Sequence, residues 1–89
     1  MGFLGLDVLA IRHLARQLDQ QSKEVDGAIR ELTELIKSTE WYGVDSRRFL
    51  EQWEANRVPE LRRAAEQLAE ASRLASHGAS EQERVSRGG

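Results

Sequence analysis

The chain has 89 residues, no cysteine, one proline, and 13 basic against 15 acidic side chains. This length accommodates one small domain, and the absence of cysteine excludes disulfide bonds as a means of stabilising it. The nearly balanced charge gives no electrostatic reason to expect a nucleic acid or an anionic membrane as the partner. A domain of this size buries little surface, so we expect self-association or a partner to add burial, a well-packed helical monomer being the alternative.

The first residues are apolar but do not resemble a secretory signal. They carry no basic segment, and Asp7 interrupts them well before a signal-peptide core is complete. No apolar run approaches the roughly 20 residues that span a bilayer. We therefore expect no stable membrane insertion and, if the protein leaves the cell, export without a general secretory signal.

Residues 8–39 are predicted to form the first helix, since they include no proline, one glycine and many good helix formers. Asp7 is a plausible N-cap. Large apolar residues recur with heptad spacing, and Gln21 is the polar exception. They are Ile11, Leu14, Leu18, Val25, Leu32 and Leu35, with Ala28 between them and Ile29 and Ile36 widening the stripe. This spacing predicts one continuous apolar face along the helix.

The heptad pattern stops at residues 40–45, where a tight helix-helix turn is predicted. Gly43 can take a left-handed backbone conformation, and Asp45 can cap a new helix. Trp41 and Tyr42 lie in this turn, so an aromatic cluster is expected at the closed end of the hairpin. Such a cluster either caps the local core or is partly exposed for recognition.

The second helix is predicted over residues 46–76, where the inward positions share one broad face. These positions are Phe49, Leu50, Trp53, Val58, Leu61, Ala65, Leu68, Ser72 and Ala75. Pro59 removes one amide and crowds the carbonyl of Ala55, so we expect a kink, or else a short break, near residues 56–58. Residues 77–89 are rich in Gly, Ser, Glu and Arg and are predicted to be a flexible tail.

Two long helices joined by a short connection predict an all-α fold, an antiparallel helix-turn-helix hairpin. Each helix presents an apolar face wider than one neighbour can cover, so we expect the hairpin to dimerise into a four-helix bundle. The expected dimer or partner interface consists of Ile11, Leu14, Leu18, Val25, Ile29, Leu32, Ile36, Phe49, Trp53, Leu61 and Leu68.

Catalytic, metal-binding and cofactor-binding motifs are not found. His13 and His77 have no further ligands at helical spacing, so we interpret both as structural or surface histidines. The sequence contains no cysteine nucleophile and no glycine-rich phosphate loop. Carboxylates and arginine pairs alternate as on a solvated helix face. We therefore expect no enzyme, no cofactor and no nucleic-acid partner.

The tripeptide Trp41-Tyr42-Gly43, central in the chain and flanked by two long helices, resembles the signature of the WXG family of small type VII secretion substrates. Further positions resemble the actinobacterial branch of these early-secreted-antigen-like proteins: Asp45, Arg48, Phe49, Trp53, Pro59, Glu60, Leu61, Arg62, Leu68, Ala71 and Ala75. The resemblance implies a hairpin domain over residues 1–82 that pairs with itself or with a paralogue into a four-helix bundle. It also implies export, folded and paired, through an ATPase-driven type VII system, or service as partner to a larger effector. In this reading Trp41 and Gly43 form the turn motif of the export mark.

The tail departs from the family pattern. Family members that carry the export signal themselves have a tyrosine after the second helix, followed four residues later by an acidic residue. Here Tyr42 is the only tyrosine. Three possibilities follow from this departure. A partner carries the export signal, this chain uses a different signal in its tail, or the chain is not exported. A cytosolic adaptor that holds a helix of a larger protein is the alternative function.

Overall fold

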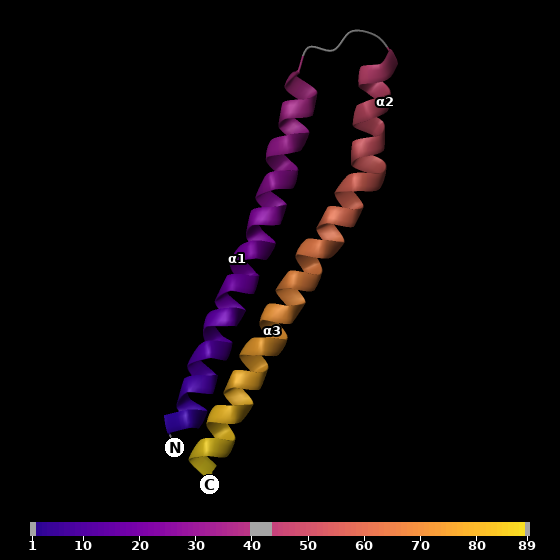
Figure 1. The fold of residues 1–89 in the computed structure, drawn as a ribbon. Coiled ribbons are helices and arrows are strands. Elements are labelled where there is room, and N and C mark those ends of the chain that lie inside the picture. Colours follow the sequence, from indigo (N-terminus) through magenta and orange to yellow (C-terminus); the bar gives the residue numbers. More distant parts are fainter. Residues whose placement is uncertain (1, 40–43, 89) are drawn as a thin grey trace.

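The protein is an antiparallel helical hairpin, seen here in a computed structural model that describes residues 2–39 and 44–88, with side chains for 8–39 and 45–85. One arm is α1 (Gly2–Ser38). The other consists of α2 (Val44–Gln52), the π-helix η1 (Trp53–Arg57) and α3 (Val58–Gly88). The arms lie side by side with both chain ends at one end of the rod (Figure 1), which measures 68 × 17 × 12 Å. The predicted all-helical hairpin is confirmed.

Both helices extend further at the open end of the hairpin than predicted. α1 begins at Gly2, so Asp7 lies within it and is not its N-cap, and α3 continues to Gly88, so residues 77–88 are no flexible tail. The two ends hold each other in place. Ala79 is fully buried and Val8 nearly so, and Arg12 Nη2 lies 2.7 Å from a carboxylate oxygen of Glu83. Packing and an ion pair thus provide the stabilisation of this helical segment that its composition alone does not provide.

At the closed end the second arm starts earlier than predicted. α2 begins at Val44, which places Asp45 in its first turn rather than at the N-cap. A carboxylate there still favours the helix, because the first turn carries the positive end of the helix dipole. The predicted turn motif, Trp41 and Gly43, lies outside the described residues.

Near Pro59 the second arm is neither a regular α-helix nor broken. Residues 53–57 form one wide π turn, in which the Val58 N–H donates to the Trp53 carbonyl oxygen, five residues back. The arm changes direction between α2 and α3 (Figure 1). Proline has no N–H to donate and its ring crowds the carbonyl four residues earlier, so a widened turn just before it relieves the conflict. The expected kink therefore takes the form of a π turn.

The π turn also corrects the phase of the helix. Counting back seven residues from the buried Val58 leads to the exposed Glu51, which a regular helix would direct at α1. Because η1 absorbs one extra residue, the half-buried Leu50 takes that place instead. Leu50 and Ile36 line the same groove at the closed end of the hairpin. A charged residue is thereby kept out of the contact between the two arms.

Candidate partner-binding face

The two arms meet along a seam of small residues spaced by seven. On α1 the buried residues are Val8, Ala15, Ser22 and Ile29, and on the second arm they are Val58, Ala65 and Ala79, with half-buried Ser72 completing the series. A seven-residue repeat is expected for two helices that keep one stripe in contact. Alanine and serine at its centre have short side chains, so the helix backbones can approach closely.

Two hydrogen bonds fix the register of the seam. The Ser22 hydroxyl donates to the Ala65 carbonyl oxygen at 2.7 Å, and the Ser72 hydroxyl donates to the Ala15 carbonyl oxygen at 2.7 Å. The two bonds are reciprocal, because Ala15 lies seven residues before Ser22 on α1 and Ser72 lies seven residues after Ala65 on α3. A slip by one residue would break both bonds and turn other side chains into the seam.

This seam uses only part of the predicted apolar stripe. Ile29 lies inside the hairpin with 4% of its surface exposed, so it belongs to the intramolecular contact and not to a partner face. The other predicted interface residues lie one or four positions before a seam residue, or near the closed end. Leu14, Leu32 and Phe49 are exposed, whereas Ile11, Leu18, Val25, Ile36, Trp53, Leu61 and Leu68 are half-buried.

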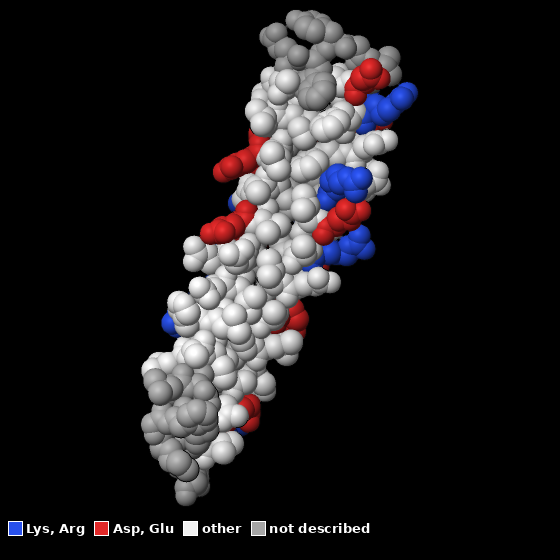
Figure 2. Space-filling model, in the orientation of Figure 1, with Lys and Arg blue, Asp and Glu red and all other residues white. Residues whose placement is uncertain are grey.

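Most of these residues, together with further uncharged residues on the same side of both arms, form what we term the apolar face; Ile36 and Trp53 are not part of it. On α1 it comprises Ile11, Leu14, Leu18, Gln21, Val25, Ala28, Leu32 and Leu35, and on α3 Leu61, Ala64, Leu68, Ala71, Ala75 and Gly78, with Phe49 at the closed end. Leu35 remains 60% exposed and Leu14 49% exposed. Figure 2 shows one face of the rod on which charged side chains lie mainly along the two edges. Large apolar side chains exposed along one face are typical of an interaction surface.

The closed end of the hairpin is pinned by an aromatic side chain. Trp53 Nε1 donates to Thr33 Oγ1 at 2.8 Å, and the Thr33 hydroxyl in turn donates to the Ile29 carbonyl oxygen at 2.7 Å. Lys37 and Glu54 add an exposed ion pair at 3.8 Å. Trp53 therefore serves first as a link between the arms, at the end where the apolar face carries its bulkiest exposed residues.

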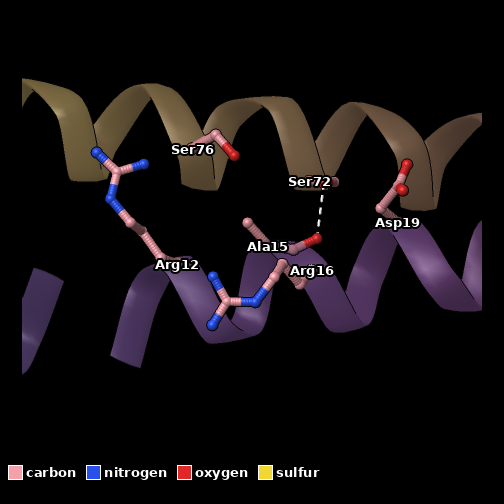
Figure 3. A pocket seen from close by; sticks show the side chains of 6 residues that line it. All are labelled: Arg12, Ala15, Arg16, Asp19, Ser72 and Ser76. Carbon is pink, nitrogen blue, oxygen red and sulfur yellow. Dashed lines mark hydrogen bonds between the residues drawn. The ribbon is translucent and has the colours of Figure 1, made fainter. Parts of the chain in front are cut away.

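The opposite side of the hairpin is polar. A shallow groove there is lined by Arg12, Ala15, Arg16, Asp19, Ser72 and Ser76. Figure 3 shows Arg12 extending from α1 towards α3, and Ser72 bonded to the Ala15 carbonyl. Arg12 and Arg16 lie there beside Asp19, a mixture of charges that is typical of a solvated surface. The α1 stripe on the other side carries no charged residue, so the two sides of the hairpin differ in charge and the apolar face is the candidate for partner binding.

No group of three or more His, Cys, Asp or Glu side chains in residues 2–39 and 44–88 is arranged to hold a metal ion. His13 is exposed, and His77 lies 3.8 Å from Glu81 on the same helix. Within the same residues no helix is both long and apolar enough to cross a membrane.

The heptad pattern of large residues predicts neither the small seam residues nor the π turn, although the sequence contains a signal for each. Large residues surround Ala15 and Ser22 and dominate the pattern, yet the seven-residue spacing of these two with Val8 and Ile29 is visible in the sequence. The π turn is signalled by the five-residue spacing from Trp53 to Val58, in a face otherwise spaced by three and four.

No family model, no curated protein and no solved structure matches this chain.

Proposed function

We propose that this protein works by pairing through the apolar face, as a non-catalytic secretion-associated protein of the WXG type. The observation that carries the proposal is the uncharged stripe of α1, which the seam with α3 leaves largely uncovered. Two hairpins that lay these faces together form a four-helix bundle, which removes the exposed apolar surface from water. The partner is a second copy or a paralogous chain.

The secretion role rests on the resemblance around Trp41 and Gly43. In this proposal the chain is made in the cytoplasm, pairs there, and leaves through a type VII system as a substrate or as partner of a larger effector. A membrane ATPase of that system is then a further partner. The long hairpin and its apolar face support this role because they provide the surface for folded pairing.

Pairing is tested by size-exclusion chromatography with light scattering on Leu32→Asp. Leu32 is 43% exposed on the apolar face, so a buried unpaired carboxylate there should dissociate a pair without unfolding the hairpin. Leu9→Asp is the matched control, since Leu9 is 65% exposed and follows the seam residue Val8, on the side away from the face. If both variants keep the mass of the parent, or only Leu9→Asp lowers it, the apolar face is not the pairing surface.

Export is tested by comparing culture supernatant and cell lysate in the native host. We expect the protein in the supernatant, its loss when the secretion ATPase is deleted, and reduced export of Trp41→Ala. Unchanged export after both changes would refute the secretion role. Retention in the cytoplasm of an unperturbed host, together with a folded monomer in solution, would favour the adaptor that holds a helix of a larger protein.

A further inference from the structure

The buried seam stops well before the closed end of the hairpin. Its last buried residues in that direction are Ile29 on α1 and Val58 on the second arm. Beyond them, none of the described side chains in residues 30–39 and 45–57 is buried. Figure 1 shows the two arms drawing apart over the same stretch. Because burial of apolar surface is the main stabilising term in folding, the closed end is held less tightly than the seam.

Two grooves enter between the arms at the closed end. One has a volume of about 470 Å³, and Thr33 of α1 and Glu54 of η1 are among its lining residues. The other has a volume of about 310 Å³ and is lined in part by Ile36 of α1 and Leu50 of α2. Since each groove is lined by residues of both arms, the arms are not packed against each other along their full length here.

The second arm is weakest where η1 joins α3. Pro59 has no N–H to donate, and the Val58 N–H donates to the Trp53 carbonyl oxygen across the wide π turn. A helix bends most readily at such a point. The helix on the far side, α2, has nine residues, fewer than the roughly 12–15 that a helix needs to persist alone in water. Once detached from α1, α2 would therefore lose its helical structure.

A hydrogen bond between two side chains ties this part of the second arm to α1. Trp53 Nε1 donates to Thr33 Oγ1 at 2.8 Å, and both residues are half-buried. The nearby ion pair of Lys37 and Glu54 is about half exposed and 3.8 Å long, so it adds little. The indole therefore holds the second arm against α1 just beyond the last buried residues of the seam.

We propose that α2 and η1, which we term the closed-end segment, open from α1 as one unit while the seam stays closed, and that the Trp53–Thr33 bond is the latch. Opening exposes Ile36 and Trp53 and removes Phe49 from the apolar face. The residues of that face on α1 and α3 stay in place, because the seam holds their helices together. The opening does not depend on the proposed pairing, but a partner that covers Phe49 in its helical position would favour the closed state.

Hydrogen exchange of the full chain, followed amide by amide by NMR, tests this proposal. We expect the amides of residues 48–57 to exchange through a local opening that depends little on added denaturant. The amides of the seam helices should exchange through global unfolding, which exposes more surface and depends strongly on denaturant. The change from one class to the other should fall at the junction of η1 and α3. A single class along the whole second arm would overturn the proposal.

Matched glycine substitutions at two exposed glutamines separate the closed-end segment from the seam. Gln52→Gly weakens α2, which melts in the local opening and in global unfolding, so exchange should quicken about threefold in both classes. Gln67→Gly weakens α3, which stays folded during the local opening. Exchange should then quicken about threefold in the seam and stay unchanged in the closed-end segment. Equal acceleration of both classes by Gln67→Gly would show that the hairpin opens only as a whole.

Thr33→Val tests the latch, because valine keeps the shape of threonine but cannot accept a hydrogen bond from Trp53 Nε1. Loss of this bond should quicken exchange in the closed-end segment about two- to tenfold. All three variants replace side chains outside the buried seam, so the hairpin is expected to fold, and far-UV circular dichroism checks that it remains helical. Unchanged exchange in the closed-end segment of Thr33→Val would overturn the role of the Trp53–Thr33 bond.

Discussion

The extra residue of η1 can be removed without disturbing the seam on either side of it. Deleting Asn56 together with Pro59→Ala converts the π turn into regular α-helix while keeping Leu50 and Val58 in phase. Alanine is favoured over proline by about 3 kcal/mol in a helix interior. Part of this gain is already realised by the widened turn, so we expect the double variant to be as stable as the parent or about 1–3 kcal/mol more stable.

The matched control is deletion of Glu70, an exposed residue of α3. There no π turn can absorb the change, so the following residues rotate by about 100° and carry Ser72 and Ala79 out of the seam. Losing the hydrogen bond to Ala15 costs about 1 kcal/mol, and exposing Ala79 costs about 1 kcal/mol more. Thermal unfolding at equal protein concentration should show a Tm lower by about 4–8 °C per kcal/mol. Equal losses from the two deletions would refute the phase explanation of η1.

Three further changes probe the seam and the helices. Ser22→Leu forces a large side chain between closely packed helices and should lower the free energy of unfolding in denaturant by about 1–3 kcal/mol. The control Gln20→Leu, at an exposed position, should change it by less than about 0.5 kcal/mol. Similar values for the two variants would contradict the small-residue seam. Gly27→Ala should stabilise the hairpin by about 1 kcal/mol in the same denaturant unfolding, because the added methyl meets only the Arg30 guanidinium at 3.9 Å. A loss of stability would contradict the open space at this position. Arg12→Ala removes the ion pair with Glu83, so hydrogen exchange should quicken at the open end and stay unchanged at the closed end; uniform protection would argue against a local tie.

The close packing of the arms explains why the large residues point elsewhere. Ala15 and Ser22 occupy the centre of the seam, and a leucine in either place would hold the helices apart. The bulky residues therefore flank the contact, and Leu14 and Leu32 remain exposed. In the proposed pairing, a second surface would bury these larger side chains.

The amino-acid sequence by itself determined the elements: two long helices, a connection near Gly43, a distortion before Pro59 and a broad apolar stripe on each arm. These follow from local rules, namely helix propensity, heptad spacing and the missing amide of proline. The turn residues Trp41 and Gly43 stay a prediction, as does the role in secretion.

Only the tertiary structure decided which part of the stripe faces the other arm. Heptad spacing shows that a helix has an apolar side, but Ile29 and Leu32 are equally apolar, and only the neighbouring helix determines that Ile29 is buried and Leu32 exposed. The same holds at the open end, where the composition of residues 77–88 predicts disorder while contact with α1 makes them helical. Local propensity acts within a few residues, whereas burial depends on contacts between residues such as Ser22 and Ala65, which are 43 positions apart in the chain.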